Sequence, residues 1–120
     1  MNKIRLESST GKLIWVNTYT QKMYIFSGST GNWRLIAGPW SVSTGAPSTM
    51  TSTGVARIKQ QDYYNDYLYY WSVVSWFSIH GRLPEWPMGY PYSNGCVRNT
   101  DEHAGYVYYN CPIGTTVYVY

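Results

Sequence analysis

A cysteine and a histidine, the two residue types of a thiol nucleophile and its base, lie close together in this chain. Cys96 stands in the stretch Ser93-Asn94-Gly95-Cys96-Val97-Arg98, and His80 precedes it by sixteen residues. A cysteine attacks as a thiolate, so it needs a nearby base and a positive charge. His80 is the base that the sequence offers, and Arg98 adds a positive charge two residues beyond the thiol. This pattern is typical of a cysteine that attacks a carbonyl group.

Attack on a carbonyl creates an oxyanion, which hydrogen-bond donors must stabilise. Gly95 permits a tight turn beside the thiol. We expect the backbone N–H groups of Gly95 and Cys96 to point at the developing oxyanion. A helix predicted to begin at Asn99 would bring its positive end close to the thiol and would favour the thiolate.

The predicted base follows the most apolar run of the chain. Trp71–Ile79 is expected to be a single central strand that carries His80 at its C-terminal end. Gly81 then frees the backbone. Residues 81–92 form a loop with three prolines, which is long enough to fold back and bring Cys96 to His80.

Short apolar runs broken by turn residues predict a mainly β fold around these two residues. Pro39 cannot donate to a ladder, so it predicts a bulge or a sheet edge. Gln60–Tyr70 is polar and has no clear period. The predicted strands are Lys12–Thr18 and Lys22–Ser27 as a hairpin, a third strand of Trp33–Ala37 and Trp40–Thr44 that Gly38-Pro39 interrupts, Val55–Ile58, and Thr115–Tyr120.

One short helix is predicted after the nucleophile. Asn99 is its expected N-cap, with Glu102 reaching back in a capping box. His103 is expected on the solvated first turn. A disulfide between Cys96 and Cys111 is sterically possible, but Cys111 lies at the end of the apolar stripe and is predicted to fill the core. The stripe follows helical spacing through Ala104, Val107, Tyr108 and Cys111, and Asn110 and Pro112 end the helix.

Composition restricts the possible partners. The 120 residues suit one domain, predicted over 1–120, and the net charge of +3 is too small for a nucleic-acid-binding protein. No apolar run is long enough to span a membrane, and no basic, then apolar leader begins the chain. Two histidines and one free cysteine in unrelated places do not make a zinc site. Neither a metal nor a cofactor is predicted.

The combined pattern resembles the signature of the YkuD-type L,D-transpeptidases. That family has His-Gly, here His80-Gly81, then a spacer and a Ser-His-Gly-Cys-Ile/Val-Arg stretch that corresponds to residues 93–98. Ser41–Gly45 resembles its strand ending in Ser-Thr-Gly, and Asn110–Tyr120 resembles its closing Pro-x-Gly-Thr and strand. The resemblance implies a mixed, closed β-sheet of the YkuD-like sandwich or barrel type around the cysteine, with one short helix after it.

The resemblance also implies a reaction. The Cys96 thiolate would attack the carbonyl of the third residue of a peptidoglycan stem tetrapeptide, release D-Ala and pass the acyl group to an amine, forming a 3-3 cross-link. The Gly81 carbonyl would orient His80, and carbapenems would acylate Cys96. The protein would act as a monomer outside the cytoplasm, in a bacterial cell wall or periplasm, with any signal or anchor not in this chain.

One position departs from the family pattern, because Asn94 stands where the family has a second histidine. Asn94 can order a hydrogen bond or an oxyanion but cannot shuttle a proton. Ser93, Trp86 and Tyr92 are expected near the substrate, although the two aromatic residues would equally well pack their loop down. Two alternatives stay open: an L,D-carboxypeptidase on the same scaffold, and a non-catalytic wall-binding module. NlpC-type endopeptidases place the cysteine before the histidine, which is the reverse of this order.

Overall fold

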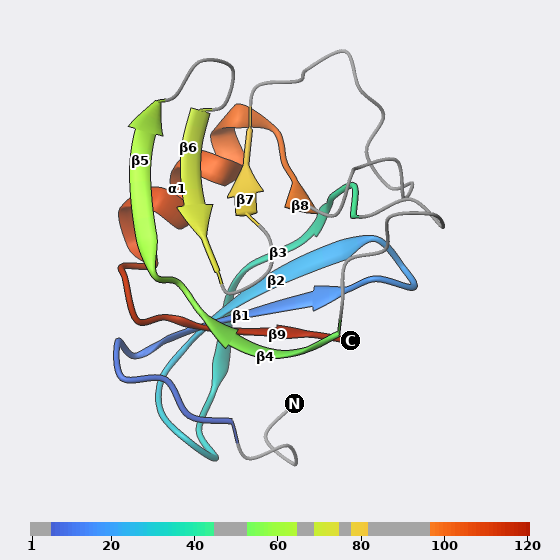
Figure 1. The fold of residues 1–120 in the computed structure, drawn as a ribbon. Coiled ribbons are helices and arrows are strands. Elements are labelled where there is room, and N and C mark those ends of the chain that lie inside the picture. The colour runs from blue at the N-terminus through green and yellow to red at the C-terminus, as the bar shows by residue number, and fades with distance from the viewer. Residues whose placement is uncertain (1–5, 45–52, 65–68, 75–77, 82–96) are drawn as a thin grey trace.

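The computed structural model describes residues 6–44, 53–64, 69–74, 78–81 and 97–120. The described strands form two sheets (Figure 1). The larger has the order β3-β2-β1-β9-β4, built from β1 (Lys12–Asn17), β2 (Lys22–Ser27), β3 (Arg34–Ser41), β4 (Gly54–Arg57) and β9 (Thr116–Val119). The smaller has the order β5-β6-β7-β8, built from β5 (Gln60–Tyr64), β6 (Tyr69–Val73), β7 (Ser78–His80) and β8 (Val97–Arg98).

The predicted class, mainly β with mixed pairing and one helix, is confirmed. Strands β1 and β9 are parallel, as are β7 and β8, while the other pairs are antiparallel. Within the described segments the strands lie in two sheets, and no described pairing closes either sheet into a barrel. The helix α1 (Asp101–Asn110) contacts β6 and β7 of the smaller sheet.

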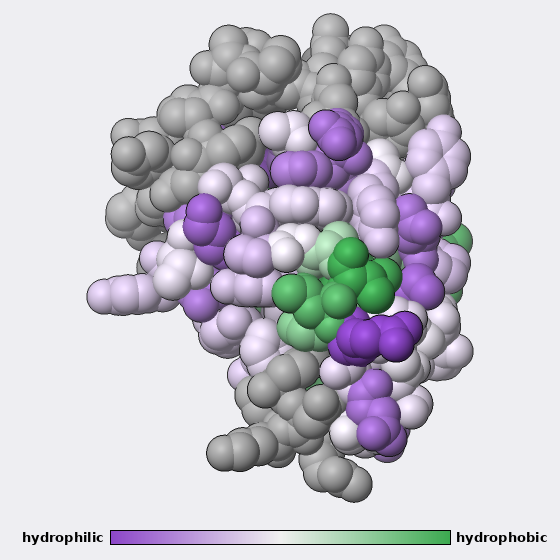
Figure 2. All heavy atoms as spheres, turned by 180° about the vertical axis from the view of Figure 1, so that it is seen from behind, coloured by the Kyte–Doolittle hydropathy of each residue, from purple (hydrophilic) through white to green (hydrophobic). Residues whose placement is uncertain are grey.

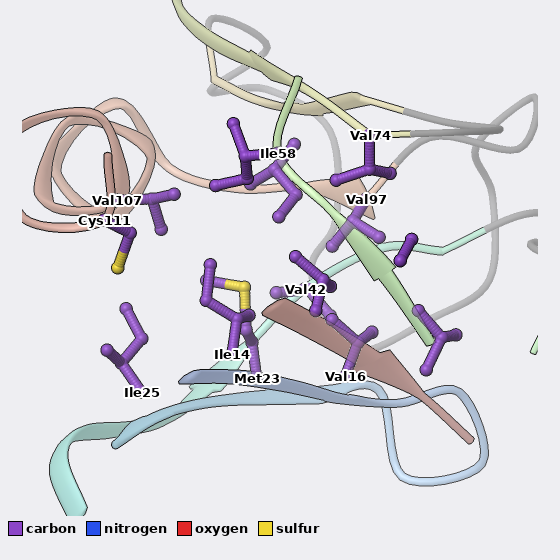
Figure 3. Packing of buried hydrophobic residues seen from close by; sticks show 14 residues of the cluster. Ile14, Val16, Met23, Ile25, Val42, Ile58, Val74, Val97, Val107 and Cys111 are labelled. Atoms are coloured by element: carbon purple, nitrogen blue, oxygen red, sulfur yellow. The ribbon is translucent and has the colours of Figure 1, made fainter. Parts of the chain in front are cut away.

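The main core lies where the larger sheet faces α1 and the smaller sheet. Alternate residues of β1 and β2 point inward, namely Ile14 and Val16 of β1 with Met23 and Ile25 of β2. Figure 3 shows side chains from the helix and from both sheets converging on this interior. The core therefore fixes the smaller sheet, which carries His80, against the larger one.

Pro39 lies at a sheet edge and near a bulge, as predicted. Strand β3 lies at the edge of the larger sheet, and its pairing with β2 shifts register on either side of Ile25. A proline fits such a place because the edge and the bulge spare it a ladder hydrogen bond. The predicted interruption is wrong, however, because β3 runs through Pro39 as one strand.

The prediction of a single strand over Trp71–Ile79 is wrong. Strands β6 and β7 pair antiparallel, with Ser72 opposite Ile79 and Val73 opposite Ser78, so the chain reverses between them. No glycine or proline in this run signals the reversal, and apolar residues continue through it from Trp71 to Ile79. Strand β5 was also not predicted, because its polar residues show no alternation.

The helix begins one residue later than predicted. Thr100 is its N-cap, and the Thr100 side chain accepts a hydrogen bond from the His103 N–H, so the capping box of Asn99 with Glu102 is wrong. The apolar stripe is confirmed by the complete burial of Ala104, Val107 and Cys111.

Part of the surface is hydrophobic, in a chain of which only 12% of the residues are charged. Figure 2 shows one compact group of hydrophobic residues on the back of the molecule, bordered by hydrophilic ones. Leu35 and Ile36 on the edge strand β3 are 45% and 38% exposed. In the described part of the chain, no helix has the length and hydropathy needed to cross a membrane.

Candidate active site

His80 ends β7 and is almost completely buried, with 4% of its surface exposed. Its Nδ1 lies 3.0 Å from the carbonyl oxygen of Gly81. Because a carbonyl oxygen can only accept, this contact requires a proton on Nδ1 and leaves the lone pair on Nε2. The structure thus contains the contact with Gly81 that the resemblance implied. In this tautomer Nδ1 carries the proton and Nε2 can accept one.

The surroundings of His80 favour its neutral form. Burial lowers its pKa below the usual 6.5, the Gly81 carbonyl acts in the opposite direction, and the positive charge of Arg98 lowers the pKa further. An imidazole with a lowered pKa is unprotonated at neutral pH. His80 can therefore accept a proton under these conditions.

Strand β8 holds the segment next to Cys96 against this histidine. Ile79 is paired with Val97 and His80 with Arg98, and the Asn99 N–H donates to the His80 carbonyl oxygen at 2.8 Å. Val97 is bonded directly to Cys96 in the sequence. The predicted base therefore lies on β7, and the residue that follows the predicted nucleophile lies on the parallel neighbouring strand β8.

Arg98 is buried beside the site, and its backbone pairs with that of Ser43. The two residues exchange backbone hydrogen bonds of 3.0 and 2.8 Å. This bridge connects the segment after β3, which belongs to the larger sheet, with β8 of the smaller one. Arg98 is paired with His80, and its positive charge contributes to lowering the His80 pKa.

Three residues of this cluster were not predicted as site residues: Asn99, Ser43 and Thr44. Asn99 was expected to cap the helix, but it is buried, and its amide donates to the Val97 carbonyl oxygen at 3.2 Å. Its Oδ1 has no hydrogen-bond partner among the described residues. The Ser-Thr-Gly end of the third strand was the sequence signal that points to Ser43 and Thr44.

Most of the predicted nucleophile and substrate residues lie outside the described residues, namely Trp86, Tyr92, Ser93, Asn94, Gly95 and Cys96. Their roles stay predictions. Of the predicted site residues, the structure places His80, Gly81 and Arg98 together.

Cys111 is the core residue that the sequence predicted. It is free and fully buried, and burial raises its pKa to about 12. Among the described residues, Cys111 therefore has no disulfide partner. Across the segments that the structure describes, no group of His, Cys, Asp and Glu residues could hold a metal ion.

His103 is not the solvated residue that was expected. Its ring stacks on Trp40 with the centroids 3.9 Å apart and the planes 5° from parallel. The edge strand β3 brings Trp40 to the first turn of α1, and Nδ1 of His103 is buried there without a described partner. Burial lowers the His103 pKa, and nearby Glu102 acts in the opposite direction.

Known structures share this fold. A fused zinc-dependent amidase/peptidase and peptidoglycan-binding-domain protein of Clostridium acetobutylicum superposes with a TM-score of 0.86 at 24% identity, covering 99% of this chain and 56% of its own. An L,D-transpeptidase of Stackebrandtia nassauensis gives 0.80 at 22% identity, covering 98% and 59%. L,D-transpeptidase 3 of Mycobacterium tuberculosis, solved with a faropenem-derived adduct, gives 0.71 at 15% identity, covering 91% and 60%.

This chain thus spans less than two thirds of each of these proteins. No curated protein matches it. The L,D-transpeptidase catalytic domain family, also called YkuD, matches residues 11–119, which is nearly the whole chain. With the mixed two-sheet fold and the buried His80 in place, this match shows that the chain belongs to the L,D-transpeptidase catalytic domain family.

Proposed function

We propose that the chain is the catalytic domain of a peptidoglycan L,D-transpeptidase in which Cys96 is the nucleophile and His80 the general base. The observation that carries the proposal is the contact between His80 Nδ1 and the Gly81 carbonyl. It fixes a neutral imidazole with Nε2 available for the thiol proton. Membership of the family supports the reaction class.

The position of Cys96 in the chain supports the pairing. A trans peptide separates its Cα from that of Val97 by about 3.8 Å. Val97 is in turn paired with Ile79, the residue before His80. Paired strands lie about 4.8 Å apart. The connection of Cys96 to Val97 is therefore consistent with a nucleophile close to the base.

Acylation follows from this pair. His80 Nε2 takes the proton from the Cys96 thiol, and the thiolate forms a bond to the carbonyl carbon of the third stem residue. The oxyanion then collapses, the C–N bond to D-Ala breaks, and the imidazolium returns its proton to the leaving amine. The product is a thioester on Cys96 and free D-Ala.

In the transfer step the proton moves in the opposite direction, from the acceptor amine through His80 to the sulfur. An amine of a second stem attacks the thioester carbonyl while His80 takes its proton. The C–S bond breaks and the thiolate regains the proton, so the enzyme is restored and an amide joins the two stems. Water in place of the amine gives L,D-carboxypeptidase activity.

We assign supporting roles to the neighbouring residues. The N–H groups of Gly95 and Cys96 would bind the oxyanion. Arg98, buried at the end of β8, would stabilise the negative thiolate by its positive charge. The same charge lowers the His80 pKa and so keeps the base neutral before the reaction. Asn94 and Ser93 would order the substrate carbonyl, and Trp86 and Tyr92 would contact the stem peptide. This substrate would place the protein outside the cytoplasm, at the cell wall or in the periplasm. We propose separately that the protein acts as a monomer.

The test is incubation with a disaccharide-tetrapeptide followed by mass spectrometry of the products. A cross-linked dimer with release of D-Ala supports the proposal, whereas a tripeptide alone indicates a carboxypeptidase. Cys96→Ala is expected to abolish both products while the fold is retained, and His80→Ala to slow them by about 10²-fold or more. No product from the folded wild-type protein would favour the wall-binding module instead.

A carbapenem offers a second test that needs no acceptor. The M. tuberculosis relative was solved with an adduct derived from faropenem, a penem β-lactam related to the carbapenems, and this motivates the test. We expect a stoichiometric mass increase on Cys96, because acylation needs the thiolate and the oxyanion donors but no second imidazole. Asn94→His should change the rate of acylation or of deacylation rather than the ability to react. An unmodified mass at long times would contradict the proposed oxyanion site.

A further inference from the structure

Gln21, in the turn between β1 and β2, is a polar residue with 3% of its surface exposed. Its φ of 58° lies in the left-handed region, where it is the only non-glycine residue among those described. A residue of this type stays in that region only when its surroundings hold it there. The hydrogen bonds of its side chain identify what holds it.

The Gln21 amide is fully used on two segments. Its Nε2 donates to the Thr18 carbonyl oxygen at 2.6 Å and to Thr44 Oγ1 at 2.7 Å. Its Oε1 accepts from the Thr44 N–H at 2.9 Å. The Gln21 carbonyl also accepts from the Val42 N–H at 3.0 Å. One side chain thus clamps the segment after β3 to the turn between β1 and β2.

That segment is the one against which the site is built. Ser43, next to Thr44, exchanges two backbone hydrogen bonds with Arg98, and Asn99 donates to the His80 carbonyl. In Figure 1 the end of the described segment after β3 lies between β8 and the β1–β2 turn. From Gln21 through Thr44 and Ser43 to β8, the contacts join buried residues, so water cannot readily replace a lost partner.

We propose that Gln21 is a positioning residue for the Cys96–His80 pair. By fixing Thr44 at both its N–H and its hydroxyl, Gln21 sets the place of Ser43, and Ser43 sets the place of β8, whose first residue follows Cys96. The inference rests on the proposed function of that pair. Gln21 itself touches neither the substrate nor the reacting atoms.

The useful variant is Gln21→Gly, because glycine accepts a φ of 58° without strain. It removes the side-chain clamp and keeps the backbone of the turn. The matched control is Asn17→Ala in the same turn. Asn17 Oδ1 accepts from the N–H groups of Tyr19 and Thr20, at 2.9 and 3.1 Å, and has no described bond to the segment after β3.

The first readout is the alkylation rate of Cys96 by iodoacetamide as a function of pH, which needs no peptide substrate. The wild-type profile should depend on His80, as comparison with His80→Ala shows. Gln21→Gly should move the profile toward that of His80→Ala, with a loss of roughly tenfold or more at neutral pH, since small misplacements of paired groups cost up to about 10²-fold. Asn17→Ala should keep the wild-type profile.

The second readout is turnover of the stem tetrapeptide. Gln21→Gly should lower kcat with KM changed by less than about twofold, because the clamp acts on the pair and not on substrate binding. A profile for Gln21→Gly that overlays the wild type, in a folded protein, overturns the inference, as does an equal effect of Asn17→Ala. Absence of peptide turnover in the wild type counts against the proposed function, while the alkylation profiles still decide the role of Gln21. A wild-type profile that is independent of His80 overturns both.

Discussion

At the scale of single residues, His80 combines burial with one retained hydrogen bond. Burial alone would leave a polar ring without a partner, which is costly in the interior of a protein. The Gly81 carbonyl accepts from Nδ1 and leaves the lone pair of Nε2 for a proton. This arrangement makes the pH dependence of the reaction a direct test of the site.

The acid limb of kcat/KM should lie below pH 6.5. The base acts only when neutral, so activity falls as the pH drops through its pKa, and that pKa is lowered by burial and by Arg98. Arg98→Gln should move the limb upward, whereas Arg98→Lys keeps the charge and should keep the limb. Arg57→Gln, at an exposed position on β4, is the control. An unmoved limb in a folded Arg98→Gln protein would contradict this role of the charge.

The two cysteines should differ sharply in reactivity. Cys111 is fully buried and its pKa is raised to about 12, so it is a thiol with no access to reagent. Limited iodoacetamide should therefore label Cys96 first, and Cys111 only after denaturation. Peptide mapping by mass spectrometry measures the order, and early labelling of Cys111 in the folded protein would contradict it.

The sequence predicted His80 and Arg98 because their types and local spacing carry the signal, and the role of the Gly81 carbonyl followed from the family resemblance. It did not predict Gln21 as a site residue, since its partner Thr44 lies twenty-three positions away and a glutamine in a turn has no distinctive local pattern. Asn99 was given the wrong partner for a similar reason. Its position before a helix suggested a cap, but β7 supplied a stronger use for its N–H group.

At the scale of elements, the start of α1 is set by Thr100. Thr100→Ala should lower the free energy of unfolding by about 1 kcal/mol, because the His103 N–H loses its acceptor. Thr100→Ser keeps the hydroxyl and should retain most of the stability. Urea unfolding of the three proteins measures the difference. Equal stability of wild type and Thr100→Ala would mean that another residue caps the helix.

The strands show where local patterns stop being informative. The boundaries of β1, β2 and β9 follow from alternating apolar residues bounded by turns, and their predicted ranges were close. Strands β6 and β7 could not be separated, because a mostly apolar run without glycine or proline has the same pattern whether it forms one strand or two. Pairing, which is a long-range property, decides between them.

At the scale of the whole molecule, the fold should become less stable as the pH falls. The pKa values of His80 and His103 are both lowered in the folded state, mainly by burial, so below pH 6.5 the unfolded chain binds more protons. Stability contributed by the neutral rings is complete above 6.5 and is lost as the pH falls through the folded-state values.

Urea unfolding at about pH 7 and about pH 5 measures this loss. The double variant His80→Gln with His103→Gln should show a smaller decrease in the free energy of unfolding between the two conditions. An unchanged decrease would assign the effect to other groups.

The position of β9 has a consequence for the order in which the molecule can be assembled. It is the last strand along the chain, yet it lies between β1 and β4, and its end is tied to the first strand because Tyr120 donates to the Val16 carbonyl and accepts from the Thr18 N–H. During synthesis, the first hairpin can form early, but the larger sheet stays split until residues 116–119 have left the ribosome. A nascent chain halted before that point would expose two unpaired strand edges, so this domain should acquire its final shape only after synthesis has passed its last strand.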